Sequence, residues 1–310
     1  MGARGCRPRT HLVAEAVGPL HPAIFGRPGG GLAVQECDPL ASSPMDVSAR
    51  NHVTVSGPPD GPPMMFAPGF GCDQTMWRFV IPAFEDRYRI VAFDHVGTGG
   101  SDIGAYDPDR YASLAGYADD VLQICDALDL PPVIFVGHSV SSMIGALAAI
   151  REPTRFDRLI MVGPSPRYID EGDYVGGFSA DDIDELLTSL DSNYLGWSGA
   201  IAPVIMGNPD RPELGDELTA SFCKNDPDIA RRFAQVTFTG DNRDDLPKVT
   251  TPTLVLQCDQ DAIAPREVGT YVHDRLPDSE LVLLRATGHC PHLSAPGETI
   301  AAMESFLARR

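Results

Sequence analysis

The sequence has few basic residues. It contains 24 lysines and arginines against 43 aspartates and glutamates, which gives a formal net charge of −19. A surface with this charge repels phosphate backbones and anionic lipid headgroups at long range. We therefore expect neither a nucleic-acid partner nor a membrane partner, and we interpret the acidity as a determinant of solubility.

Long apolar runs and paired cysteines are also missing. No stretch approaches the ~18 apolar residues that a membrane-spanning helix requires. The N-terminal stretch is interrupted by Glu15, Gly18 and Pro19 and makes a poor signal-peptide core. The seven cysteines are odd in number and include no Cys-x-x-Cys pair, which favours reduced thiols. These absences predict a soluble, cytoplasmic protein.

Residues 1–44 lack any sustained hydrophobic period of 2 or 3.6 and are rich in Gly, Pro and Arg. This composition predicts a disordered N-terminal extension. Met45 begins the first segment that resembles the start of a folded domain. A misassigned start codon, with Met45 as the true start, is the preferred explanation, and a genuine flexible tail is the alternative.

Short apolar runs alternate with helical patterns in the rest of the chain. The central runs are apolar throughout, as expected for parallel strands that are covered on both faces. The alternation predicts a mostly parallel, doubly wound sheet. The predicted strands are His52–Ser56, Met64–Ala67, Arg89–Phe93, Val133–Val136, Leu159–Val162, Thr253–Gln257 and Glu280–Leu284. The predicted helices lie near Met76–Phe84, Leu114–Leu128, Ser141–Ile150 and Pro296–Ala308.

Residues 165–248 interrupt this alternation, because they contain no convincing strand. Four helical patterns occupy the interval: Ala180–Leu190, Tyr194–Met206, Pro212–Lys224 and Pro227–Phe238. A helical insertion between parallel strands is expected over the carboxyl edge of the sheet, where ligands bind in such folds. We predict a helical lid at 165–248 and a core formed by 45–164 and 249–310.

The segment Gly137-His-Ser139-Val-Ser141 follows a predicted strand and precedes a predicted helix. This context is typical of a nucleophile elbow, in which a strained turn presents a serine hydroxyl above the sheet. The usual Gly-x-Ser-x-Gly pattern ends here in Ser141. A Gly-x-Ser turn alone is commonly only a turn, so the interpretation depends on the residues that accompany it.

A serine nucleophile needs a histidine base and a carboxylate, and this type of fold supplies them in the order Ser, acid, His. Asp259 and Asp261 follow the strand Thr253–Gln257, and His289 follows the next strand. The pattern alone leaves the two aspartates as alternatives. His289 and His292 have the spacing of a metal pair, but no second ligand cluster accompanies them. We predict no metal and no cofactor.

Acyl transfer also requires hydrogen-bond donors for the developing oxyanion, which are two backbone N–H groups in this type of site. One is expected from Val140, directly after the serine. The other is expected from Phe70, in the turn Pro68-Gly-Phe-Gly71 after the Met64–Ala67 strand. Each donor contributes ~3 kcal/mol to transition-state stabilisation.

Several phrases of the sequence together resemble one family, the RsbQ-type α/β-hydrolases of bacteria, which are similar to plant karrikin and strigolactone receptors. The resemblance extends from about Ser48 to the C-terminus. The phrases are Met65-Phe-Ala-Pro-Gly-Phe-Gly-Cys-Asp-Gln, Gly137-His-Ser-Val-Ser, Gly163-Pro-Ser-Pro-Arg-Tyr, Asp173-Tyr-Val-Gly-Gly-Phe, Leu256-Gln-Cys and Gly288-His-Cys-Pro-His-Leu-Ser.

The resemblance implies an α/β-hydrolase fold with a V-shaped, four-helix lid over a small apolar pocket. It also implies a catalytic triad of Ser139, His289 and Asp261, in preference to Asp259. By position, the pocket is expected to be lined by Phe70, Phe178, Trp197, Ile201 and Phe238.

The function implied by the resemblance is a serine esterase that acts on a small hydrophobic ligand, either an ester or a lactone. Members of the family serve as positive regulators of a stress sigma-factor pathway, together with a phosphatase that carries a PAS domain. The alternative is a metabolic carboxylesterase, or another hydrolase with the same triad, that has no signalling role.

Overall fold

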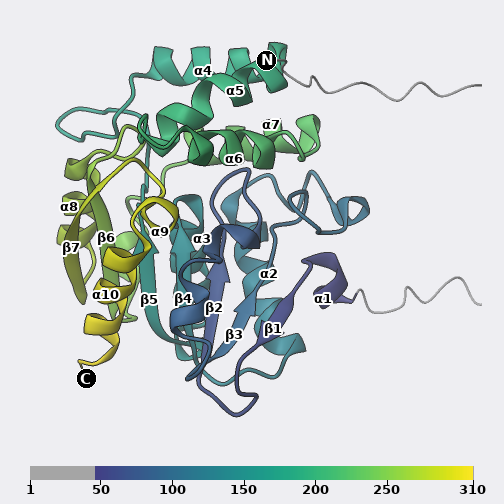
Figure 1. Ribbon diagram of the computed structural model, residues 1–310, viewed down its shortest axis with the longest axis vertical. Coiled ribbons are helices and arrows are strands. Elements are labelled where there is room, and N and C mark those ends of the chain that lie inside the picture. Colours follow the sequence, from purple (N-terminus) through teal and green to yellow (C-terminus); the bar gives the residue numbers. More distant parts are fainter. Residues whose placement is uncertain (1–45, 310) are drawn as a thin grey trace, which may run out of the picture. The chain divides into compact units, whose positions relative to one another are not determined.

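The computed structural model describes residues 46–309, so the predicted N-terminal extension and the alternative start at Met45 lie outside it. A seven-stranded sheet forms the centre of these residues (Figure 1). The strands are β1 (Thr54–Ser56), β2 (Pro63–Ala67), β3 (Arg89–Ala92), β4 (Val133–His138), β5 (Phe156–Val162), β6 (Thr253–Gln260) and β7 (Ser279–Thr287).

The strand order is β1-β3-β2-β4-β5-β6-β7. Strand β1 is antiparallel to β3, and the other neighbouring strands are parallel. Every residue of β2 and β4 is buried, which explains why these strands are apolar rather than alternating. The mostly parallel, doubly wound sheet predicted from the sequence is confirmed.

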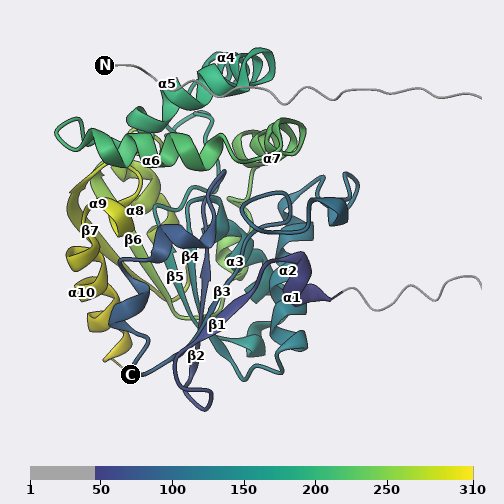
Figure 2. The same ribbon diagram turned by 45° about the vertical axis from the view of Figure 1, so that its right-hand side comes forward.

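Helices cover both faces of the sheet: α2 and α3 lie on one side and α10 on the other (Figure 2). The helices of the core are α1 (Val47–Arg50), α2 (Leu114–Ala127), α3 (Val140–Arg151), α8 (Arg266–Arg275), α9 (Pro291–Ser294) and α10 (Pro296–Leu307).

Two local predictions were wrong, and the short helices α1 and α9 were not predicted. The expected helix Met76–Phe84 is replaced by two short 3-10 helices, Gln74–Trp77 and Ile81–Ala83, because Pro82 cannot donate to a continuous ladder. Strand β1 begins at Thr54 rather than His52, whose φ of 46° is incompatible with a strand. The longer helix α8 was not predicted either.

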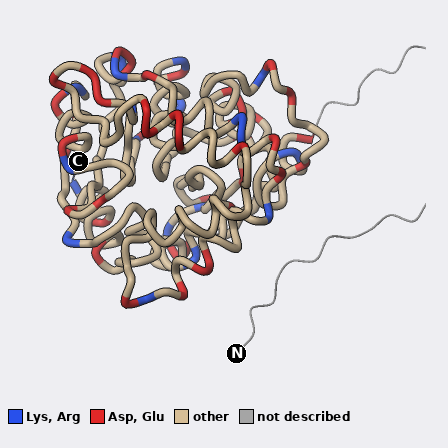
Figure 3. Tube along the Cα trace, turned by 90° about the horizontal axis from the view of Figure 1, so that it is seen from above, with Lys and Arg blue, Asp and Glu red and all other residues tan. Residues whose placement is uncertain are grey.

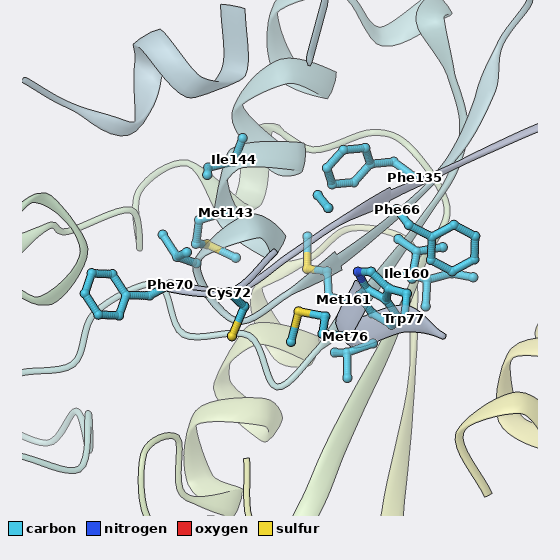
Figure 4. Packing of buried hydrophobic residues seen from close by; sticks show 14 of the residues in the cluster. Phe66, Phe70, Cys72, Met76, Trp77, Phe135, Met143, Ile144, Ile160 and Met161 are labelled. Carbon is cyan, nitrogen blue, oxygen red and sulfur yellow. The ribbon is translucent and has the colours of Figure 1, made fainter. Parts of the chain in front are cut away.

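The core beneath the site is built from β2, β4 and β5 (Figure 4). Phe66 on β2 and Phe135 on β4 are almost completely buried. The ring of Phe66 packs against Trp77 with centroids 5.3 Å apart, and Phe135 contacts the ring of Phe156 at 6.2 Å. Dense packing of this kind leaves little freedom to the strands, and so fixes the position of the loops at their ends.

Four helices between β5 and β6 lie above the carboxyl ends of the strands (Figures 1 and 2). Helices α6 and α7 lie next to the sheet, and α4 and α5 form an outer pair. We call these four helices the lid. They are α4 (Ala180–Ser192), α5 (Tyr194–Met206), α6 (Pro212–Phe222) and α7 (Pro227–Thr239).

Capping residues define where the lid helices begin. Ser179 and Asp182 form a capping box at α4, and the Asn193 side chain accepts from the Gly196 N–H at α5. Asp226 accepts from two N–H groups of the first turn of α7. These side chains satisfy donors that would otherwise have no partner, so they define the first residues of three of the four lid helices.

Acidic residues are distributed around the whole outline of the protein rather than gathered at one place (Figure 3). Within residues 46–309, no helix is both long enough and apolar enough to cross a bilayer.

Helix α3 depends on a glycine where it crosses β4. A Cβ atom at Gly145 would lie 2.4 Å from the Phe135 ring, so Gly145→Ala is expected to lower the free energy of unfolding by about 1–3 kcal/mol through overpacking. Gly199→Ala in α5 is the matched control, because nothing lies within 4 Å of its added Cβ. This control should gain about 0.5–1 kcal/mol from helix propensity. Urea denaturation of both variants measures the difference, and equal effects at the two sites would contradict the packing argument.

Candidate active site

Ser139 occupies a strained turn between β4 and α3. Its φ of 55° and ψ of −123° are unusual for a residue with a side chain. Gly137 allows the turn to close, because a Cβ at this position would lie 2.5 Å from the carbonyl oxygen of Ser141. The sequence Gly-x-Ser-x-Ser therefore folds into a sharp turn that raises the Ser139 hydroxyl above the sheet.

The side chains of Ser139, His289 and Asp261 form one hydrogen-bonded chain. His289 Nε2 lies 2.8 Å from Ser139 Oγ, and His289 Nδ1 lies 2.7 Å from Asp261 Oδ2. The residues follow β4, β7 and β6, whose carboxyl ends meet at one edge of the sheet. Asp259 is exposed and lies 3.8 Å from Arg266. The structure thus places Asp261, and not Asp259, against the imidazole.

Asp261 is buried, and its carboxylate accepts hydrogen bonds from the protein. Its Oδ1 accepts from the N–H groups of Ile263 and Ala264 at 2.8 and 3.1 Å. Burial raises the pKa of this carboxyl, but the neighbouring His289 and the hydrogen bonds together outweigh burial and hold the pKa below its ordinary value. Asp261 is therefore a carboxylate at neutral pH and can orient a histidine that gains a proton.

The two predicted oxyanion donors are available beside Ser139. Phe70 lies in the loop after β2, and its backbone N–H has no hydrogen-bond partner within residues 46–309. Val140 is the first residue of α3, so its N–H has no partner within the helix. Two unpaired N–H groups near a buried hydroxyl are what a developing oxyanion requires.

Tyr168 is a neighbour of Ser139 that the sequence interpretation did not identify. Its hydroxyl lies 3.3 Å from Ser139 Oγ, and burial raises its pKa to about 12, so it remains protonated at neutral pH. Tyr168 closes the phrase Gly163-Pro-Ser-Pro-Arg-Tyr, but no spacing rule connects it to Ser139. Only the path of the loop after β5 brings it there.

An apolar cavity of about 30 Å³ lies above Ser139. Trp197, Ile201 and Phe238 line it as predicted, together with Phe70. Phe178 does not, and that prediction was wrong: it lies at the end of the loop before α4, where it pairs with Ile169. The further lining residues are Cys72, His138, Ser139, Tyr168, Leu186, Ile205, Leu218, Phe222, Thr237, Ile263, His289 and Cys290.

The Phe70 side chain is the centre of an aromatic cluster that joins the core to the lid. Its ring centroid lies 5.5–6.2 Å from the rings of Phe233, Phe238, Phe222 and Trp197. All four of these rings belong to α5, α6 or α7. The side chain of Phe70, whose N–H is the predicted oxyanion donor, is thus held by the lid.

A cluster of potential metal ligands lies beside His289. Ligand atoms of His138, Cys290 and His292 lie within 4.8 Å of one another. His138 Nε2 donates to the carbonyl oxygen of His289 at 2.8 Å, and the His292 ring packs against Trp77. Burial lowers the pKa of His138 to about 3, lowers that of His292 well below its ordinary value and raises that of the Cys290 thiol, so all three groups are neutral. The hydrogen bond gives His138 a role in holding the His289 loop.

The protein thus combines an α/β sheet, a strained turn at Ser139 and a hydrogen-bonded chain of Ser139, His289 and Asp261 at the carboxyl edge of the sheet. These features are typical of the hydrolases built on an α/β sheet. Residues 64–303 match the alpha/beta hydrolase family. The chain belongs to this family.

Similar proteins include both plant and bacterial relatives. A protein named Karrikin insensitive 2 receptor IA from Petunia hybrida is 39% identical over 76% of this chain and 86% of its own length. Strigolactone esterase D14 from Arabidopsis thaliana is 36% identical over 79% and 92%. The solved structure of a hydrolase from Oleispira antarctica is 41% identical, with a TM-score of 0.83 over 86% of this chain and 97% of that one.

Buried neutral histidines predict that the protein is destabilised by acid. Burial lowers the pKa of His95 from 6.5 to about 4 and that of His138 from 6.5 to about 3. Below pH 6.5 the unfolded chain therefore binds protons that the folded protein does not, and the free energy of unfolding falls as the pH falls towards 4. His95 alone accounts for about 3 kcal/mol of this loss.

Urea denaturation between pH 7 and pH 5 measures this slope. His95→Phe should make the pH dependence shallower, whatever its effect on the stability at pH 7. An unchanged slope in the variant would show that His95 does not contribute.

Proposed function

We propose that the protein is a serine hydrolase of the carboxylic-ester type that acts on a small, apolar ester or lactone. The hydrogen-bonded chain from Asp261 through His289 to Ser139, beneath an apolar cavity, is the observation that carries the proposal. Membership of the alpha/beta hydrolase family and relatives whose names include esterases support it.

In the proposed reaction, Ser139 Oγ attacks the substrate carbonyl carbon while His289 Nε2 takes the hydroxyl proton. The carbonyl oxygen becomes an oxyanion that accepts from the N–H groups of Phe70 and Val140. Collapse of this intermediate breaks the ester bond, and His289 gives the proton to the leaving oxygen. Water then attacks the acyl-enzyme by the same route, which releases the acid and restores Ser139. Asp261 stabilises the imidazolium in both halves.

The cavity lining supports a neutral, apolar substrate. Among its described lining residues there is no Lys, Arg, Asp or Glu, so a charged substrate would lose its hydration without gaining a counter-ion. Aromatic and aliphatic side chains from the lid form nearly half of the lining. An uncharged ester or lactone with a compact apolar body fits this chemistry.

Ser139→Ala tests the proposal directly. The variant should lose p-nitrophenyl acetate hydrolysis by at least about 10³-fold, because no other group supplies the nucleophile. Circular dichroism and thermal unfolding should show an intact fold. Hydrolysis at the wild-type rate would end the proposal.

The two aspartates provide a matched pair of variants. Asp261→Asn should lower kcat by about 10⁴-fold, because the amide favours the wrong tautomer of His289. Asp259→Asn removes the same charge from an exposed position two residues away and should leave kcat unchanged. A larger loss in the Asp259 variant would reverse the assignment.

We further propose that this hydrolase acts in the cytoplasm as an RsbQ-like positive regulator of a stress sigma-factor pathway, with a PAS-domain phosphatase as its partner. Three plant relatives carry the word receptor in their names, which supports a signalling role for the shared scaffold. We assign the contact with the partner to helix α5, where Leu195 and Val204 are about half exposed. The alternative remains a metabolic carboxylesterase.

Purification of the tagged protein from its native cells separates the two roles. A PAS-containing phosphatase should copurify with the wild type, and the double variant Leu195→Glu, Val204→Glu should lose it while keeping wild-type hydrolysis of p-nitrophenyl acetate. Absence of such a phosphatase, together with fast turnover of a metabolic ester, would favour the carboxylesterase.

A further inference from the structure

The loop that carries the Phe70 N–H is attached to the lid by a buried side chain. Asn225 lies between α6 and α7 and is only 7% exposed. Its Nδ2 donates to the carbonyl oxygen of Gly71 at 2.8 Å, and Ser221 Oγ donates to the same oxygen at 3.2 Å. The lid therefore binds the main chain of this loop directly, in addition to packing on the Phe70 ring.

The hydrogen bond from Asn225 to Gly71 is the first in a chain of hydrogen bonds that passes through two peptide units. The Gly71 carbonyl belongs to the same peptide unit as the Cys72 N–H, which donates to the Gly69 carbonyl at 3.2 Å. The Gly69 carbonyl shares its peptide unit with the Phe70 N–H. In a planar trans peptide the C=O and N–H point in opposite directions, so the Phe70 N–H is aimed away from the Cys72 bond. Hydrogen bonds in such a chain also polarise one another.

The start of the loop is held from the opposite side. Ser141 Oγ donates to the carbonyl oxygen of Pro68, and His95 Nε2 lies 2.7 Å from Ser141 Oγ. Because these groups belong to the core, the start of the loop is fixed without the lid. The end of the loop is held by the lid, through Asn225 and Ser221. Gly71 adopts a φ of +71°, and a Cβ there would lie 2.6 Å from the Phe222 ring of the lid, so this close contact requires glycine.

We propose that Asn225 is a positioning residue that aims the Phe70 N–H at the oxyanion through the peptide units 71–72 and 69–70. The inference rests on the proposed hydrolase function. It assigns to the lid a part in transition-state stabilisation that is separate from its contacts with the substrate.

Asn225→Asp and Asn225→Leu test this role. Both keep the approximate shape of the side chain and remove the shorter of the two hydrogen bonds to the Gly71 carbonyl oxygen, while the bond from Ser221 stays. Each should lower kcat for p-nitrophenyl acetate about tenfold, a fraction of the 10²–10³-fold that loss of a whole oxyanion donor costs, and leave KM within about twofold. Inhibition by phenylboronic acid, whose tetrahedral adduct on Ser139 places an oxygen at the oxyanion position, should weaken about tenfold in parallel.

Asn242→Ala is the matched control. Asn225 and Asn242 lie on either side of α7, and the Asn242 amide donates to Asp245 rather than to the loop. The control should keep kcat, KM and boronic-acid affinity. Thermal unfolding identifies any variant that is simply less folded, and Asn225→Asp decides the comparison if Asn225→Leu is destabilised.

The outcomes separate the inference from the proposed function. Wild-type kcat and boronic-acid affinity in the Asn225 variants, with activity still abolished in Ser139→Ala, would overturn the positioning role alone. A loss confined to KM would also overturn it, because it would assign Asn225 to substrate binding. Activity that survives in Ser139→Ala would overturn the hydrolase proposal first.

Discussion

The hydrogen-bonded chain of Asp261, His289 and Ser139 is the interaction on which the site depends, and the sheet makes it geometrically available. Parallel strands deliver their carboxyl ends to one edge, so residues 150 positions apart in the sequence are neighbours in space. The turn that presents the Ser139 hydroxyl requires a left-handed φ at this residue. Packing of α3 and β4 around this turn keeps a conformation that a free chain would avoid.

The lid is bound to the site at more points than a simple cover would need. The N–H of His289 donates to the carbonyl oxygen of Ile205 on α5 at 2.8 Å. A Cβ at Gly288 would lie 1.8 Å from the Met206 carbonyl oxygen, so the loop before His289 also passes directly against α5. With the bond from Asn225 to Gly71, the lid contacts the loop of His289 and the loop of Phe70 through their main chains.

Much of this architecture could be predicted from local patterns. Apolar runs identified most strands, and helical patterns identified all four lid helices, because such periodicity is visible within a short stretch of sequence. Helix α8 escaped because Gly269 weakens its pattern, whereas in the structure a Cβ there would lie 2.7 Å from Gln257. The roles of Tyr168 and Asn225 were not predicted, and Phe178 was wrongly placed in the pocket. The positions of these residues depend on the path of loops and on which face of the lid meets the core. No short-range pattern encodes that.

The size of the cavity links the chemistry to the movement of the lid. About 30 Å³ is room for water rather than for an ester, and side chains of α5 and α6 form part of the lining. The same helices hold the His289 loop and, with Asn225, the loop of Phe70. If opening the lid loosens these main-chain bonds, the acid–base chain and the oxyanion donors are fully aligned only after the lid has closed over the ligand. Occupancy and lid conformation are then thermodynamically linked. An esterase uses such a link to exclude water during turnover, and a regulator can use it to present a different α5 surface to its partner.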